Sequence, residues 1–214
     1  MAGVALPKKW QGASIWALYA IGMMPAVFTF YLGATGSLGA DPVKTFERTL
    51  GLWALRFLIA TLAVSPLRDL AGVNLLRYRR ALGLLTFYYA LMHFGAYMLL
   101  DQRLDLQAVI ADIVKRPYIT IGMACLLLLV PLAVTSNGYS IRKLGRNWNR
   151  LHKLVYLIAA GAALHFAMLV KVITLEPFVY ISIVALLLAY RILRPWLSRR
   201  RRKDGRVLAA RQQA

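Results

Sequence analysis

The chain is poor in acidic residues, in histidine and in cysteine, and each scarcity narrows the chemistry that it can support. Its 214 residues include 8 Asp and Glu, 3 His and 1 Cys. A single cysteine, Cys125, provides no disulfide, no CxxC metal site and no CxxCH site for covalent cofactor attachment. The few acids face 27 Lys and Arg, which leaves a formal net charge of +19.

Apolar residues are abundant and lie in long blocks. Hydrophobic residues make up 60% of the chain and charged residues 16%, whereas a soluble domain is about half apolar and about one quarter charged. Each block has roughly the 20 residues that a helix needs to cross a bilayer, and helices satisfy their backbone hydrogen bonds within lipid. We therefore predict an all-α integral membrane protein, a six-transmembrane-helix bundle. The expected helices are 12–32, 47–65, 81–100, 117–134, 151–171 and 176–194.

The basic residues alternate along the chain rather than forming one patch. The segments 1–11, 66–80, 135–150 and 191–214, with Lys153, hold 20 of the Lys and Arg. The intervening loops carry bases and acids in equal numbers. This is the positive-inside pattern, and it predicts a multi-pass membrane protein with both termini in the cytoplasm. We expect the basic cytoplasmic tail, residues 195–214, to contact anionic lipid and expect no nucleic-acid partner.

Two of the histidines lie inside predicted membrane helices. His93 is twelve residues after Ala81 and His165 is fourteen after Leu151, so both lie roughly 18–21 Å from the cytoplasmic boundary. A buried imidazole is costly without a partner, and imidazole is the usual axial ligand of haem iron. We predict that the pair binds one haem iron from both faces and supports electron transfer. With Cys125 alone, the haem would be b-type. Hydrogen bonding between helices is the alternative role for each histidine.

The third histidine, His152, precedes His165 by thirteen residues, roughly 20 Å along a helix. This spacing suits a second redox centre near the cytoplasmic face, with His152 as one ligand. A second ligand at the depth of His152 would have to come from the helix of His93, where that position is Arg80 or Arg79. Of these two residues, Arg79 shares a face with His93. Because arginine is a poor iron ligand, a second haem remains open, and an ordinary solvated histidine is the alternative.

Arg56 lies near the centre of the predicted helix 47–65. A charge at that depth is expensive and needs a counter-ion, yet no acidic residue lies at comparable depth in any predicted helix. A haem propionate would supply the negative charge, so Arg56 is a candidate cofactor-binding residue. Snorkelling towards an aqueous cavity is the alternative.

Several stretches together resemble one family. They are GLWALRFLIATLAVSPLR, RRALGLLTFYYALMHFGAY, KRPYITIGM, PLAVTSN and LGRNWNRLHKLVYLIAAGAALHF. They look like MsrQ (also called YedZ), within the ferric-reductase-like transmembrane superfamily. The resemblance implies one haem-binding transmembrane domain over 1–214, with functional histidines at His93, His152 and His165. It also implies haem b and FMN as cofactors.

The resemblance further implies a place in a redox system. Proteins of this family pass electrons from the quinone pool, or from a cytosolic flavin reductase, across the bacterial inner membrane to MsrP, a periplasmic molybdopterin enzyme that reduces methionine sulfoxide. This reaction repairs oxidised periplasmic proteins. The chain would then be an electron-transfer subunit without catalytic residues. The basic loops 66–80 and 135–150 are candidate sites for the FMN phosphate, although topology alone explains their charge.

Two alternatives remain. NADPH oxidases and ferric reductases carry four histidine ligands on two helices, whereas the predicted helix 81–100 has only His93. The chain also has no glycine-rich NAD(P)H signature. A transmembrane ferric reductase or NADPH-oxidase-like conduit is nevertheless possible with a separate flavin partner. A cofactor-free membrane transporter is the second alternative, although the predicted helices have few polar residues to line a path.

Overall fold

The structure is a computed structural model that describes residues 8–169 and 175–212, with side chains for 10–169 and 175–195. Six of its helices are long and apolar enough to cross a membrane. The prediction of an all-helical protein with six membrane helices is thereby confirmed for the described residues. The six stretches are Trp10–Ala34, Pro42–Ala71, Leu76–Asp101, Pro117–Val134, Arg146–Leu169 and Leu175–Pro195. Their main helices are α1 (Lys8–Ala34), α2 (Pro42–Ala71), α3 (Arg79–Ala96), α5 (Pro117–Val134), α8 (Leu154–Leu169) and α9 (Leu175–Gln212).

The segments between the long helices contain short helices that we did not predict. These are η1 (Leu76–Tyr78), the π-helix η2 (Tyr97–Asp101), α4 (Leu106–Lys115), α6 (Gly138–Leu144) and α7 (Arg146–Leu151). Side-chain caps explain where two of them begin. The Asp105 carboxylate accepts hydrogen bonds from the first amides of α4, and the Asn137 side chain does the same for α6, as N-cap residues do.

Three predicted helices differ most from the structure. We expected the second over 47–65, whereas α2 covers Pro42–Ala71 and so includes part of the segment 66–80. We expected one helix over 151–171, but α7 ends at Leu151 and α8 begins at Leu154, with His152 in the turn between them. Residues 170 and 171 lie outside the described residues. We expected the last helix to end at 194, whereas α9 continues to Gln212 through most of the tail 195–214.

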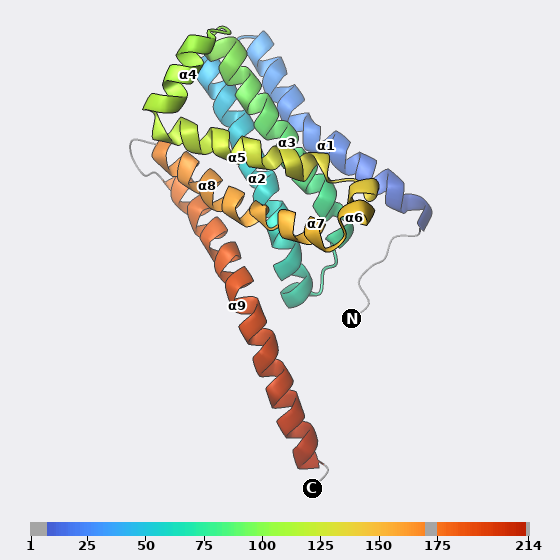
Figure 1. The fold of residues 1–214 in the computed structure, drawn as a ribbon. Coiled ribbons are helices and arrows are strands. Elements are labelled where there is room, and N and C mark those ends of the chain that lie inside the picture. Colours follow the sequence, from blue (N-terminus) through green and yellow to red (C-terminus); the bar gives the residue numbers. More distant parts are fainter. Residues whose placement is uncertain (1–7, 170–174, 213–214) are drawn as a thin grey trace.

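The helices form two packed groups that share α2. Figure 1 shows α1, α2 and α3 running side by side, with α5 and α8 lying across them as a second pair, and α9 extending beyond the bundle. One core lies between α1, α2 and α3 and includes Leu50, Leu85 and Tyr89. The other joins α2, α5, α8 and α9 through residues such as Leu58, Ile158 and Val184. Both groups face α2, so a site between them is enclosed by helices on several sides.

Tyr89 holds α3 against α1 at the proline of α1. The Tyr89 hydroxyl donates to the Gly22 carbonyl at 2.7 Å and accepts from the Ala26 amide at 3.0 Å. These two backbone groups bond directly in a regular α-helix. Pro25 lies one residue before Ala26 within α1, and proline disturbs the hydrogen bonds around it. A neighbouring membrane helix therefore satisfies the backbone groups beside Pro25.

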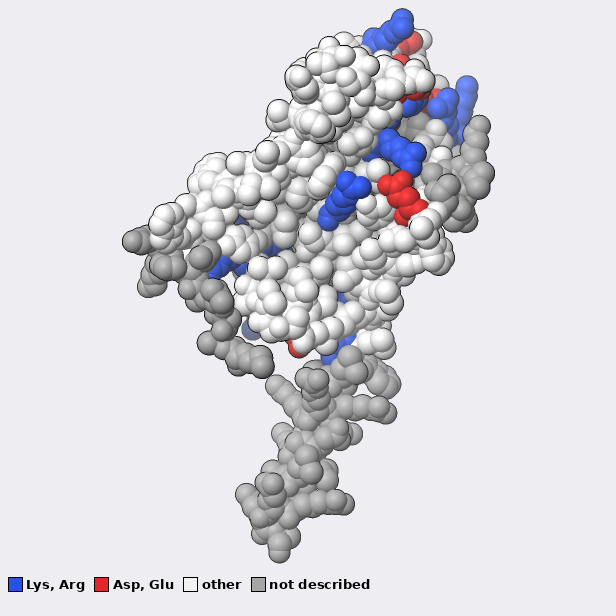
Figure 2. All heavy atoms as spheres, turned by 180° about the vertical axis from the view of Figure 1, so that it is seen from behind, with Lys and Arg blue, Asp and Glu red and all other residues white. Residues whose placement is uncertain are grey.

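The outer surface of the bundle is largely apolar. Large side chains such as Trp16, Phe30 and Leu186 are 67–75% exposed on α1 and α9. In Figure 2 much of one face is uncharged, and its charged side chains gather mainly along one edge. Continuous apolar surface of this extent is rare on soluble monomers. It fits contact with lipid and a multi-pass membrane protein.

Candidate histidine-lined cofactor site

His93 and His165 face the same cavity from two different helices. His93 comes from α3 and His165 from α8, and both line a cavity of about 510 Å³. Their ring centroids are 6.3 Å apart and the ring planes are inclined at 77°. Cofactor sites commonly measure about 300–1,000 Å³. The structure thus brings together the two histidines that we predicted to form a pair.

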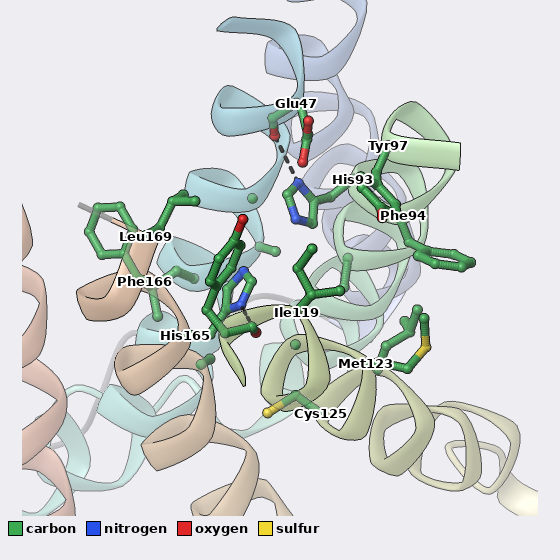
Figure 3. Close-up of a pocket in the computed structure, with 18 of the residues that line it drawn as sticks. Glu47, His93, Phe94, Tyr97, Ile119, Met123, Cys125, His165, Phe166 and Leu169 are labelled. Carbon is green, nitrogen blue, oxygen red and sulfur yellow. Dashed lines mark hydrogen bonds between the residues drawn. The ribbon is translucent and has the colours of Figure 1, made fainter. Parts of the chain in front are cut away.

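Each imidazole is oriented by a main-chain carbonyl. His93 Nδ1 lies 2.9 Å from the Glu47 carbonyl oxygen, and His165 Nδ1 lies 2.6 Å from that of Tyr118. Since a carbonyl only accepts hydrogen bonds, Nδ1 is the donor in both, and Nε2 of the neutral ring keeps its lone pair. Metal-ligating histidines typically use their second nitrogen in this way. Figure 3 shows each hydrogen-bonded nitrogen pointing away from the other ring.

The separation of the two rings fits a single metal ion between them. An imidazole nitrogen binds a metal such as zinc at about 2.0–2.1 Å and lies about 1.1 Å from the centre of its own ring. Two imidazoles on opposite sides of one metal ion therefore have ring centres about 6 Å apart. In the described residues no group of three or more His, Cys, Asp or Glu could hold a metal ion. Two imidazoles alone suit a metal whose other ligands come from a macrocycle, as in haem.

The cavity is apolar along its walls and charged at one end. Its apolar lining includes Leu52, Leu55, Leu129, Phe166 and Leu169. Its charged lining residues come from the beginning of α2, the end of η2 and the residue before α5. They are Lys44, Glu47, Arg48, Asp101 and Arg116. This distribution fits an amphipathic planar molecule whose acidic groups lie at that end.

The charged residues at this end are already paired in part. Lys44 Nζ lies 2.7 Å from an Asp101 oxygen, and Arg116 Nε lies 3.0 Å from Asp112. The Glu47 Oε2 atom is buried without a hydrogen bond and lies 3.8 Å from Lys44 Nζ. Lys44 is therefore the charged partner of both Asp101 and Glu47 at this end of the cavity.

Arg56 has partners on α2 and α9 and is not among the residues that line the cavity. Its Nε donates to the Tyr180 hydroxyl at 2.7 Å, and its guanidinium group lies 4.7 Å from the centroid of the Trp53 ring. Hydrogen bonding and a cation–π contact both stabilise a charge away from water. The cations that do line the cavity are Lys44, Arg48 and Arg116, and the predicted contact of Arg56 with a propionate stays a prediction.

His152 and Arg79 lie together, but away from this cavity. Arg79 is close enough for its charge to act on the His152 ring. His152 Nε2 lies 3.1 Å from the Thr135 hydroxyl, and Trp148 stacks on the ring with centroids 3.9 Å apart. Arg79 also lines a small groove with Tyr156 and Arg191. The structure brings together the two residues considered for a second haem, and that haem stays a prediction.

Sequence reasoning missed Gly51 and Gly122, which line the cavity beside the two histidines. A glycine within a membrane helix is common, so neither position stood out. The useful signal was the number of residues between each glycine and its histidine. This spacing is almost the same from Gly51 to His93 as from Gly122 to His165.

Comparison with known proteins gives a consistent set of relatives. The family described as ferric reductase like transmembrane component matches residues 50–163. Proteins of Brucella ovis, Brucella canis and Brucella suis, each named protein-methionine-sulfoxide reductase heme-binding subunit MsrQ, are 63% identical to this chain over 209 residues. The alignment covers 96% of this chain and 94% of each relative. No solved structure matches the chain significantly.

Proposed function

We propose that this chain, which belongs to the MsrQ family of haem-binding subunits within the ferric-reductase-like transmembrane proteins, carries electrons through the membrane to a protein-methionine-sulfoxide reductase. The observation that carries the proposal is the opposed pair His93 and His165 in one apolar cavity. Both rings donate through Nδ1 to main-chain carbonyls, which leaves both Nε2 atoms for a metal.

His93 and His165 would be the axial ligands of a b-type haem, which supplies one-electron redox chemistry when bound. Lys44, Arg48 and Arg116 line the charged end of the cavity and would face the propionates. The apolar side chains along the walls would exclude water from the ring. A haem held by both histidines would have no ligand position left for a substrate, so electron transfer is the chemistry that this pair would favour.

The direction of transfer follows from the charge pattern. With both termini in the cytoplasm, as that pattern predicts, the beginning of α2 and the end of η2 would be on the periplasmic side, and the charged end of the cavity would face the periplasm. The site would then deliver electrons to a periplasmic catalytic subunit, MsrP. Electrons would enter from the quinone pool or from a cytosolic flavin reductase at the inner membrane. We keep FMN, held by the basic loops 66–80 and 135–150, as part of this proposal.

A ferric reductase is the second candidate function, because the family match over residues 50–163 carries that description. In that case the same pair of histidines would serve a soluble iron chelate instead of a protein. The two functions use the same path for electron transfer and differ in the electron acceptor.

Stopped-flow oxidation of the reduced, haem-loaded protein separates these candidates. We expect fast, saturable oxidation by purified MsrP and slow oxidation by ferric citrate at equal concentration. The reverse preference would contradict the proposal and favour the second candidate. Variants of α4 in the same assay would map the surface that MsrP contacts.

A further inference from the structure

Each of the two histidines lies directly against a glycine of the neighbouring helix. A Cβ atom built on Gly51 of α2 would lie 3.2 Å from both Cε1 and Nδ1 of His93. One built on Gly122 of α5 would lie 2.9 Å from the same two atoms of His165. At 2.9 Å an added methyl group at Gly122 forces a neighbouring group to shift, and at 3.2 Å one at Gly51 requires the His93 ring to give by a few tenths of an ångström.

The glycines bear a fixed relation to the carbonyls that orient the rings. Glu47 precedes Gly51, and Tyr118 precedes Gly122, by four positions in each helix. The accepting carbonyl and its histidine are 46 residues apart in the first case and 47 in the second. The same arrangement of carbonyl, glycine and histidine is therefore built twice, once by α2 with α3 and once by α5 with α8.

Helix geometry explains why the glycine stands four positions after the carbonyl. In an α-helix the carbonyl of residue i accepts the amide of residue i+4 and retains a second lone pair. The Cβ of residue i+4 tilts towards the helix N-terminus and covers the turn that contains that carbonyl. Without a Cβ at this position, an imidazole from another helix can approach the lone pair from the side.

We propose that Gly51 and Gly122 are positioning residues that hold the two haem ligands. By leaving the Glu47 and Tyr118 carbonyls open, they allow each Nδ1–H to form its hydrogen bond and direct each Nε2 into the cavity. This inference rests on the proposed function. The bond also sets the strength of the ligand, because a donor interaction at Nδ1 makes Nε2 more basic and favours the oxidised iron.

Helix packing alone does not account for these two glycines. Gly22 also meets a close neighbour, but there the neighbour is the flexible Leu85 side chain. Gly95 lies on α3 close to His93, and nothing lies within 4 Å of its Cβ position. Glycine also weakens a helix relative to alanine. At Gly51 and Gly122, by contrast, the nearest atoms to an added Cβ are those of the imidazole rings.

The test uses haem-loaded, detergent-purified full-length protein and four single variants. Gly51→Ala and Gly122→Ala change the proposed positions. Gly22→Ala is a control for crowding away from the histidines, and Gly95→Ala is a control for a glycine of the same helix as His93. Three quantities are measured: the g-values of the low-spin ferric signal in electron paramagnetic resonance, the midpoint potential of the haem, and its affinity.

We expect both test variants to shift the g-values, to raise the midpoint potential and to weaken haem affinity by about 10- to 100-fold, the usual range for loss of an outer-shell partner. Gly122→Ala should have the larger effect, because its contact is shorter. Both controls should keep the wild-type signal and potential.

Unchanged g-values and potential in both test variants would overturn the inference, as would equal shifts in the two controls. If Gly122→Ala does not fold, Gly51→Ala decides alone, since its longer contact can be relieved by a smaller movement. A wild-type protein without any low-spin haem signal would instead contradict the proposed function, so the two failures are distinguishable.

Discussion

His93 and His165 lie on opposite sides of one cavity with ring centroids 6.3 Å apart, although they belong to different helix groups of the bundle. His93 is on α3, packed against α2, and His165 is on α8, packed against α5. The relative placement of these two helix pairs therefore sets the distance between the ligands. A cofactor bound here would link the two groups and stabilise the bundle.

The first prediction tests whether the main chain or the side chain of Glu47 orients the His93 ring. His93 donates to the backbone carbonyl of Glu47, so Glu47→Gln removes the carboxylate and keeps the hydrogen bond. We expect the g-values of the low-spin haem to remain those of the wild type. Tyr118→Phe should behave in the same way for His165. A change in g-values as large as that in Gly51→Ala would mean that the side chain orients the ring.

The second prediction compares the cations that line the cavity with the one that does not. Arg116→Gln and Arg48→Gln should weaken haem binding by a few fold each, because a half-exposed ion pair contributes up to about 1 kcal/mol. Arg56→Gln should have a smaller effect, since Arg56 is held by Tyr180 and Trp53. Haem affinity by titration into the apoprotein measures all three. A larger loss in Arg56→Gln would restore Arg56 as the propionate partner.

The third prediction concerns His152. Because His152 lies in the turn before α8, and His165 lies eleven residues after the start of that helix at Leu154, about 16 Å along it at the helical rise, His152→Ala should leave the His93–His165 haem signal unchanged. Haem content per protein, measured alongside the spectrum, reports on the second haem. A fall in content with the first signal intact would identify His152 as a ligand of that haem. Loss of the first signal would contradict the separation seen between the two sites.

The fourth prediction concerns the contact between α1 and α3. Tyr89→Phe removes the hydroxyl that joins the Ala26 amide to the Gly22 carbonyl. Leaving such buried groups unpaired costs about 1–3 kcal/mol, so the free energy of unfolding should fall by that amount. Tyr88→Phe is the matched control, since Tyr88 is 44% exposed on the same helix. An equal loss in both variants would show that the Tyr89 hydroxyl has no special role.

The membrane helices and the pairing of His93 with His165 could be predicted from the sequence, because apolar length and depth along a helix are one-dimensional quantities. The orientation of each ring could not. It depends on how far α2 and α5 are rotated about their axes, and that rotation decides whether Gly51 and Gly122 face the histidines. For the same reason the partner of Arg56 was missed: Tyr180 lies on α9, far away in the chain.

The short helices α6 and α7 show a second limit. The length of the apolar run predicted one helix from 151, but the polar residues before it form α7, and a turn at His152 separates that helix from α8. Hydropathy does not resolve such a turn. This difference moves His152 off the regular helix that we assumed when we converted its thirteen-residue spacing from His165 into a distance of roughly 20 Å.

The most direct test of the account is the spectrum of the haem in wild-type, His93→Ala and His165→Ala protein purified in detergent. We predict a low-spin bis-imidazole haem in the wild type, and loss of that signal in each single variant. Retention of the wild-type low-spin spectrum in either variant would contradict the assignment of these two histidines as opposed ligands of one iron.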